Sequence, residues 1–278
     1  MSELVTCTIR ELDGTEGSSG AAGARIADVR LNRPDKLNSL TLDLLEQLQA
    51  TAESLAGDRE LRGVLLSGEG RAFCAGLDFG SVMGEPDRFR AVFQPDVQRG
   101  TNLYQEAPWA WRRLAVPVVA AVHGHCLGGG LQIALAADYR FTTPEAKWSV
   151  LEAKWGLVPD MSGVQALSEL VRIDVAKRLA MTGEMFSGQR AVELGFASEV
   201  AEDPYAAGLA LLAEIATRSP DSVAGTKRLF DDTWSADATT TFQQERDEQS
   251  ILLGAPNTAV AQHRSLSGEP KPYGPRLR

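Results

Sequence analysis

Two glycine-rich loops are the first feature of this sequence that could carry chemistry. The segments "FCAGLDF" (73–79) and "CLGGGLQ" (126–132) each bring glycines to the end of a strand-like run, which leaves backbone N–H groups uncovered by side chains. The second loop leads into a helical pattern, so its unpaired N–H groups and the positive end of the helix dipole face outward. Two such donors that converge on one oxygen form an oxyanion hole, which stabilises the charge that develops on a reacting carbonyl.

Three polar residues near these loops are candidates for handling protons or water. Gln132 follows the last glycine of the triplet by two residues, and Glu152 and Asp160 lie in "KWSVLEAKWGLVPDMSG" (147–163). A carboxyl group can act as a general acid or base, whereas a glutamine amide positions water or substrate but does not exchange a proton near neutral pH. A structural hydrogen-bonding role for Gln132 and a loop-capping role for Asp160 remain open alternatives.

The pattern of apolar residues predicts the elements that position these loops. Strand-like runs occupy 4–12, 24–31, 62–68, 116–124 and 139–143. A flexible turn over 13–24 connects the first two. Helical spacing begins after Thr41, as an N-cap, and ends at Gly57, and a second helix covers 131–137. Strands that alternate with helices indicate an α/β layered core.

The second half of the chain reads as mostly helical. A capping box from Ser162 to Gln165 predicts a helix start there, and Ser187 opens another helix. Four further helices are predicted at 203–218, 221–234, 238–253 and 256–267. The segment 84–113 has no clear period, so we expect loose helix and loop near a site entrance. We therefore expect a core with the active site over 1–200 and a helical region over 201–278.

Composition excludes several classes of protein. The 278 residues are 44% hydrophobic and carry a net charge of −9, which argues against general binding to nucleic acid or to an anionic membrane. Cys7, Cys74 and Cys126 have no metal or redox spacing, and His123 and His125 have no evident third ligand, so we expect no metal site. No apolar run has the length of a membrane span, and the N-terminus does not read as a signal peptide, so we expect a cytoplasmic protein.

Four segments in this order resemble one known family. "LNRPDKLNSLT", "FCAGLDF", "VHGHCLGGGLQIALAADYRF" and "LEAKWGLVPDMSG" are similar to motifs of the enoyl-CoA hydratase/isomerase (crotonase) superfamily, and the resemblance extends from about residue 5 to residue 265. It implies an α/β fold, a spiral of ββα turns with a C-terminal helical region that packs trimers, often paired into hexamers. It also implies an acyl-CoA thioester as the partner and a thioester enolate as the species that the site stabilises.

The resemblance also implies which residues form the site. The oxyanion donors would be the backbone N–H groups of Leu77 and Gly129, and the catalytic side chains would be Glu152, Gln132 and Asp160. The coenzyme A tail would lie along the 32–37 turn and the 75–79 loop. The substrate-binding residues would be Lys36, Leu37, Ala75, Leu77, Asp78, Phe79, Gly128 and Gly129. No cofactor is implied beyond the coenzyme A of the substrate.

The residue at position 132 bears on which reaction is expected. Hydratases of the family use two glutamates to manage the added water, and here Gln132 replaces the first of them. One base can move a proton between two carbons, so Glu152 alone suffices for isomerisation. Hydration is better served by two carboxylates, and Asp160 could substitute for the missing one if it reaches the substrate. The sequence therefore favours an isomerase over a hydratase. Thioester hydrolysis, dehalogenation and a catalytically weak acyl-CoA-binding role remain alternatives.

Overall fold

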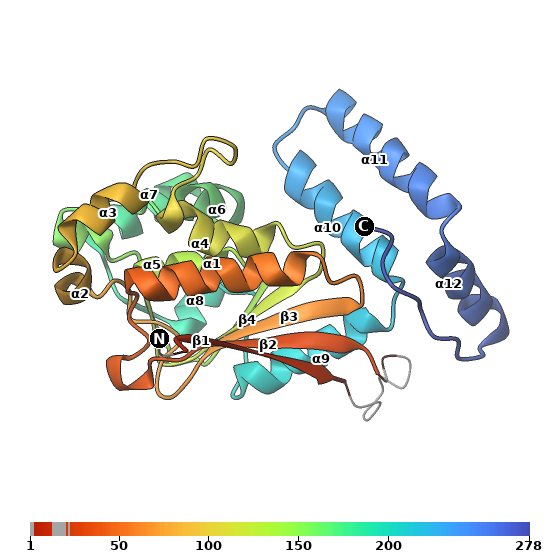
Figure 1. The fold of residues 1–278 in the computed structure, drawn as a ribbon, viewed down its shortest axis with the longest axis horizontal. Coiled ribbons are helices and arrows are strands. Elements are labelled where there is room, and N and C mark those ends of the chain that lie inside the picture. Colours follow the sequence, from red (N-terminus) through yellow and green to blue (C-terminus); the bar gives the residue numbers. More distant parts are fainter. Residues whose placement is uncertain (1–2, 13–20, 22) are drawn as a thin grey trace.

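A mixed β-sheet lies at the centre of the molecule (Figure 1). The computed structural model describes residues 3–12, 21 and 23–278, and the predicted turn at 13–24 falls mostly outside them. Within the described residues the sheet contains, in spatial order, β1 (Val5–Glu11), β2 (Arg25–Leu31), β3 (Leu61–Gly68), β4 (Val118–Val122), β6 (Tyr139–Thr142) and β9 (Glu199–Val200). β1 is antiparallel to β2, and every later neighbour is parallel. The five predicted strands are thus confirmed.

A smaller sheet diverges from the first directly after β4. In the described part of the chain it consists of β5 (His125–Leu127), β7 (Lys147–Ser149) and β8 (Phe186–Ser187). Gly124, between β4 and β5, has φ of 61°, and a Cβ there would lie 2.0 Å from the Arg71 carbonyl oxygen. Only glycine permits this close turn, which carries the chain from one sheet to the other.

Helices and short 3₁₀ turns make up most of the remaining described structure. They are η2 (Pro34–Lys36), α1 (Leu42–Ala56), α2 (Phe79–Met83), α3 (Pro86–Val92), α4 (Leu103–Arg112), α5 (Gly129–Leu135), η3 (Glu152–Trp155), α6 (Gly163–Leu170), α7 (Ile173–Thr182), α8 (Gly188–Leu194), α9 (Pro204–Ala216), α10 (Pro220–Thr233), α11 (Ala238–Leu253) and α12 (Pro256–Ser267). The predicted caps at Thr41 and Ser187 are confirmed, since each side chain accepts a bond from a backbone N–H three residues later.

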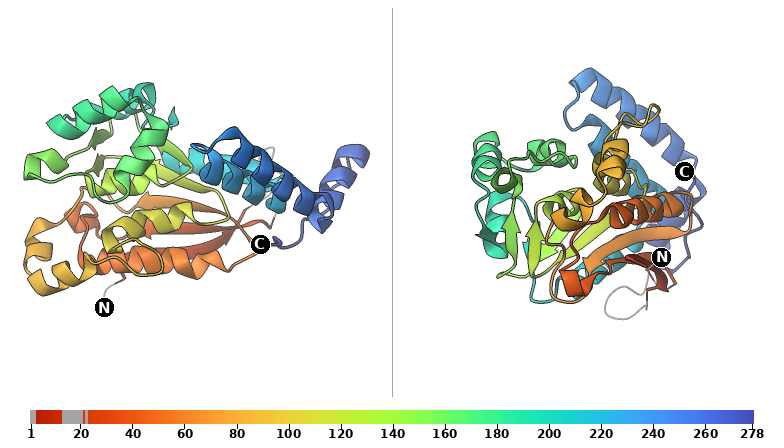
Figure 2. Two further views of the ribbon diagram at one scale, coloured as in Figure 1. Left: turned by 90° about the horizontal axis from the view of Figure 1, so that it is seen from above. Right: turned by 60° about the vertical axis from the view of Figure 1, so that its left-hand side comes forward.

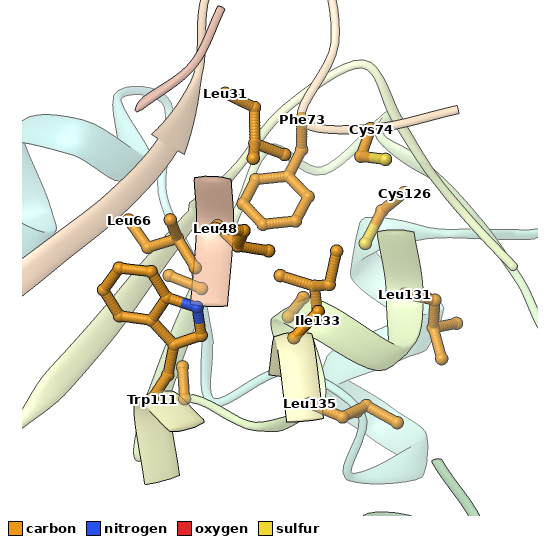
Figure 3. Packing of buried hydrophobic residues seen from close by; sticks show 14 of the residues in the cluster. Leu31, Leu48, Leu66, Phe73, Cys74, Trp111, Cys126, Leu131, Ile133 and Leu135 are labelled. Carbon is orange, nitrogen blue, oxygen red and sulfur yellow. The ribbon is translucent and has the colours of Figure 1, made fainter. Parts of the chain in front are cut away.

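The main core lies between the large sheet and the helices α1, α4 and α5. Phe73, Cys74, Cys126, Ile133 and Trp111 are among the buried side chains that gather there (Figure 3). Both cysteines are fully buried, and burial raises the pKa of the Cys74 thiol to about 12. The cysteines are therefore packing residues, and the fully buried Trp111 is a core residue as well.

The segment 84–113 is more regular than its sequence indicates. It contains α3 and α4, and α4 begins with a complete capping box between Asn102 and Gln105. Tyr104, Ala107 and Trp111 are buried along one face of α4, which is helical spacing. Pro108 inside the helix hides this pattern from a sequence reading, because proline normally ends or kinks a helix.

The C-terminal helices divide into two groups. α9 covers the second face of the large sheet, where Leu212 packs with Leu65 and Val119. The remaining helices, α10 to α12, project from one end of the molecule (Figures 1 and 2). The chain end then returns, and buried Arg276 donates hydrogen bonds to the carbonyl oxygens of Leu61 and Asp58. The boundary near residue 200 stays a prediction.

Candidate functional site

The two glycine loops lie against each other. The Cys74 N–H donates to the His125 carbonyl at 2.8 Å, and the Leu127 N–H donates to the Cys74 carbonyl at 3.0 Å. Gly76 has φ of 90°, and a Cβ on it would lie 2.9 Å from the Leu127 carbonyl oxygen. Glycine at this position therefore permits both the turn and the close approach of the two backbones.

Each loop carries one unused backbone donor. On either side of Leu77, the Gly76 carbonyl and the Asp78 N–H are both bonded to Leu40. The Leu77 N–H itself donates to no group among the described residues. Gly129 is the first residue of α5, so its N–H has no acceptor within the helix, and within the described chain it finds none elsewhere. Two free donors on touching loops are what an oxyanion hole requires.

The turn at 32–37 forms a continuous rim with the first loop. The Ala75 N–H donates to the Leu37 carbonyl at 3.0 Å, and Arg33 pairs with Asp78 at 2.7 Å. Asp78 also caps α2 through the Ser81 N–H, so Arg33 and this cap occupy its carboxylate. Lys36 is exposed on this rim. The rim thus presents the exposed Lys36 ammonium group beside the Ala75–Phe79 loop.

Gln132 links α5 to two other segments. Its amide nitrogen donates to Glu152 Oε1 at 2.6 Å, and its amide oxygen accepts from the N–H groups of Met161 at 2.8 Å and Gly163 at 3.1 Å. The side chain is 1% exposed. A Cβ on Gly163 would lie 2.4 Å from the Gln132 oxygen, so only glycine fits there. Gln132 is therefore fixed at both ends of its amide.

The predicted capping box at Ser162 is wrong, and Gln132 explains why. Ser162 precedes α6 with φ of 59°, and its side chain makes no capping bond. The Gln132 oxygen instead accepts the Gly163 N–H at the start of the helix. A residue 31 positions earlier in the chain thus serves as the cap. Local sequence cannot show this, because the partner comes from another element.

Glu152 lies beside the glycine triplet. A Cβ on Gly128 would be 3.3 Å from Glu152 Oε1, so the carboxyl group sits against the loop that carries the Gly129 donor. Glu152 is 8% exposed, and its Oε2 is buried without a hydrogen-bond partner in the described structure. Burial raises the pKa of Glu152 above its usual range; the charge of Asp160 adds to this, and the bond from Gln132 opposes it.

Asp160 is the second carboxyl group near Glu152. It immediately precedes Met161, whose sulfur lies close to Gly129. Burial raises the pKa of Asp160, and its charge acts on Glu152. Its carboxylate accepts no hydrogen bond from another residue in the described part of the chain. The structure therefore brings Leu77, Gly129, Gln132, Glu152 and Asp160 around one place.

One residue at this site has no signal in the sequence. Tyr104 on α4 is 4% exposed, and its hydroxyl is buried without a partner among the described residues. Burial raises its pKa to about 12, and the charge of Asp160 contributes. The Phe93 ring packs against the Tyr104 ring, and Trp109 stacks with Arg112.

Two other kinds of site are not found. Across residues 3–12, 21 and 23–278, no three His, Cys, Asp or Glu side chains gather closely enough to hold a metal ion. The same residues contain no helix that is both long and apolar enough to cross a membrane. His123 contacts the Gly70 carbonyl at 3.0 Å.

Comparison with known proteins identifies the family. The family model described as enoyl-CoA hydratase/isomerase matches residues 21–255. A peroxisomal Delta(3,5)-Delta(2,4)-dienoyl-CoA isomerase of Arabidopsis thaliana is 34% identical over 210 residues, which are 72% of this chain and 75% of the relative. An (E)-benzylidenesuccinyl-CoA hydratase of Thauera aromatica is 33% identical over 73% of this chain and 77% of its own length. The crystal structure of an enoyl-CoA hydratase from Bacillus anthracis has a TM-score of 0.83 at 25% identity, with 96% of this chain and 98% of that chain covered. The fold expected from the sequence is confirmed, and the chain belongs to the enoyl-CoA hydratase/isomerase family.

Proposed function

We propose that this chain isomerises double bonds in an unsaturated acyl-CoA thioester, with a 3,5-dienoyl-CoA as the preferred substrate. The observation that carries the proposal is the pair of carboxyl groups, Glu152 and Asp160, beside a glutamine whose amide is bonded at both its nitrogen and its oxygen. Both carboxyl groups have raised pKa values because of burial. The amide of Gln132 orients Glu152 through one N–H, and its oxygen already accepts two backbone bonds. An amide does not take up a proton near neutral pH, so Gln132 cannot activate water in the way a second carboxylate would.

The first step forms an enolate. The Glu152 carboxylate removes a proton from C2, the carbon next to the thioester carbonyl, and the electron pair moves through the C1–C2 bond onto the thioester oxygen. The N–H groups of Leu77 and Gly129 donate to that oxygen and stabilise its charge. The contact of Glu152 with Gly128 supports this role, since it holds the carboxyl group beside the loop that would bind the carbonyl.

The second step returns a proton at a distant carbon. In the conversion of a 3,5-dienoyl thioester to its 2,4-isomer, a proton leaves C2 and another is added at C6, while the carbon–oxygen double bond re-forms. C2 and C6 are four bonds apart, so two separate groups serve better than one carboxylate. Protonated Asp160 would supply the second proton, and exchange with solvent would reset both groups. Only protons and substrate electrons move, so the reaction needs no cofactor beyond the coenzyme A of the substrate.

The relatives support the reaction type without deciding it. One is named a dienoyl-CoA isomerase and another a CoA-thioester hydratase, at nearly equal identity. Asp160 and Gln132 favour isomerisation because a raised-pKa acid is present and a second water-activating glutamate is not. We place the coenzyme A tail along the Ala75–Phe79 rim, where exposed Lys36 can pair with phosphate.

We also propose that the chain assembles as a homotrimer, alone or as a dimer of trimers. α11 buries none of its side chains in the monomer, and Phe242, Ile251 and Leu253 on it are exposed. α10, α12 and the edge of the core also line an open cleft of ≈ 1720 Å³ that none of the predicted site residues lines. Surfaces of this kind are typical of subunit contacts.

The test is a panel of thioesters with the purified chain. 3,5-dienoyl-, 3-enoyl- and 2-enoyl-CoA are compared by the ultraviolet absorbance of thioester conjugation and by chromatography of the products. We expect fast isomerisation of the dienoyl substrate and hydration of 2-enoyl-CoA about 10²-fold slower or less, given the size of general acid–base effects. Efficient hydration with no isomerisation would refute the proposal.

A further inference from the structure

Tyr104 is a buried polar residue that the proposed steps leave unused. It is the second residue of α4, its side chain is 4% exposed, and its hydroxyl bonds to none of the described residues. A phenol that is buried without a partner loses its bonds to water and gains none in return. An unpaired buried hydroxyl at a site therefore points to a partner that it meets only during function.

The ring of Tyr104 is held in one orientation. The ring of Phe89, in α3, has its centroid 5.9 Å from that of Tyr104. The ring of Phe93, the residue that ends α3, has its centroid 6.1 Å away. The Asn102 side chain, which caps α4, also donates to the Phe93 carbonyl at 3.3 Å. These contacts fix the direction in which the hydroxyl points, because a packed aromatic ring has few alternative rotamers.

Helix packing places Tyr104 and Asp160 in the same part of the molecule. α4 packs against α5, and Gln132 on α5 binds the backbone of Met161, the neighbour of Asp160. The charge of Asp160 also contributes to the raised pKa of Tyr104, as a negative group within electrostatic range does. The charge of Asp160 acts on both Glu152 on η3 and Tyr104 on α4. Glu106, also on α4, is occupied by Arg113 and Thr101.

We propose that Tyr104 is a positioning residue for Asp160: in the substrate-bound enzyme its hydroxyl donates a hydrogen bond to the Asp160 carboxyl group and aims it at the distal carbon of the substrate. This rests on the proposed role of Asp160 as the second proton-transfer group. Catalytic hydrogen bonds are often incomplete in a free enzyme and close in the complex, which fits the unpaired hydroxyl in this structure. The phenol stays protonated at neutral pH, so it acts as the donor in a hydrogen bond with an ionised carboxylate.

The bond has a definite electrostatic consequence. A donor stabilises the ionised form of Asp160, so the bond lowers the pKa of Asp160 in the complex, and its removal raises that pKa. Asp160 must be protonated to deliver its proton, so activity is lost as pH rises through its pKa. Loss of the Tyr104 hydroxyl should therefore move the alkaline limb of the kcat profile to higher pH. The kcat/KM profile reports the free enzyme, where the bond is absent, and should move less.

The experiment compares Tyr104→Phe with the wild type, in the otherwise intact chain and combined with Asp160→Asn. Tyr139→Phe is the matched control, because Tyr139 is 41% exposed on β6. We expect Tyr104→Phe to lower kcat for the dienoyl substrate about 10- to 10²-fold with little change in KM, as for a misplaced catalytic group. In the Asp160→Asn background, the same change should alter kcat less than about twofold, because coupled residues are not additive. Tyr139→Phe should leave the profile unchanged.

The outcomes separate this inference from the proposed function. If Asp160→Asn abolishes isomerisation while Tyr104→Phe leaves kcat and its pH profile unchanged, the positioning role is wrong and the proposed function stands. Equal losses from Tyr104→Phe in both backgrounds mean that Tyr104 acts without Asp160, which also overturns the inference. If Asp160→Asn is harmless, the proposed second acid is wrong, and the role of Tyr104 fails with it. Circular dichroism and thermal unfolding check that each variant is folded.

Discussion

Replacement of Gln132 by leucine tests the central contact of the site. Leucine is close to glutamine in size but removes three hydrogen bonds, those to Glu152, Met161 and Gly163. Two are bonds from backbone N–H groups, worth about 1 kcal/mol each, and the third reaches a carboxylate and is worth about 1.5–3 kcal/mol. Their sum predicts a loss of about 3.5–5 kcal/mol in the free energy of unfolding.

The change should also lower activity. Glu152 loses the amide that orients its carboxyl group, and a displacement of about 1 Å in a reacting group can cost roughly 10²-fold in rate. The pKa of Glu152 should rise, because the bond from Gln132 opposes the effect of burial. Since Glu152 acts as a base, the acidic limb of the rate profile should move to higher pH.

Urea unfolding at a fixed protein concentration and dienoyl-CoA kinetics measure the two effects. The matched control is Gln165→Leu, since Gln165 lies on exposed α6 surface and its side chain donates to Glu169, four residues later. Such pairs contribute about 0.2–0.5 kcal/mol. If Gln132→Leu loses less than about 1 kcal/mol and keeps its rate, Gln132 does not hold the site together. Normal stability with a lost rate would mean that the amide acts directly on the substrate.

Three further predictions follow from the same geometry. Glu152→Gln should lower isomerisation by about 10²–10⁴-fold with acyl-CoA binding retained. The same change should stabilise the fold above pH 4.5, the ordinary pKa of the Glu152 carboxyl group in the unfolded chain. Because the pKa of Glu152 is raised in the folded wild type, the wild type loses stability as pH rises from 4.5 through that folded pKa, and the glutamine variant does not. A pH-independent difference in urea unfolding would contradict this second part. Gly129→Pro should lower turnover about 10²-fold more than Gly129→Ala, since both add a Cβ near Met161 but only proline removes the N–H; equal rates in the two variants would exclude that donor. Light scattering should give three or six times the chain mass of 29.9 kDa, and a monomer at micromolar concentration would contradict the proposed assembly.

Most of the fold could be predicted from local sequence. The strands at 5–11 and 61–68 and the helices at 238–253 and 256–267 agree with their apolar patterns. Thr41 and Ser187 mark helix starts because their caps bond to N–H groups three residues away. These signals depend only on near neighbours in the chain. The regular helix α4 within the segment 84–113 was not predicted, because Pro108 interrupts an otherwise helical pattern.

The sequence predicted which residues form the site, but it could not predict the hydrogen bonds between them. Gln132 meets Glu152 and Met161, which lie 20 and 29 residues further along the chain. No periodicity encodes such pairings, so the sequence left open whether Gln132 touches substrate or protein. Tyr104 was missed for a related reason. A tyrosine on the apolar face of a helix looks like core, and only its unpaired hydroxyl separates it from a packing residue.

The amide at position 132 also decides how the two carboxyl groups can differ. An amide donates to Glu152 and accepts from Met161 and Gly163 at the same time. An ionised glutamate at position 132 could still accept from both N–H groups, but it would oppose the charge of Glu152 and force the two to share a proton. The glutamine amide therefore stabilises the ionised form of Glu152 and does not place a second acid in contact with it. Among the described residues Asp160 has no such donor, and burial favours its protonated form. Burial also raises the pKa of Glu152, but there the Gln132 amide opposes the effect. In the proposed reaction this difference would let Glu152 act as the base and Asp160 as the acid of a proton shift between two distant carbons.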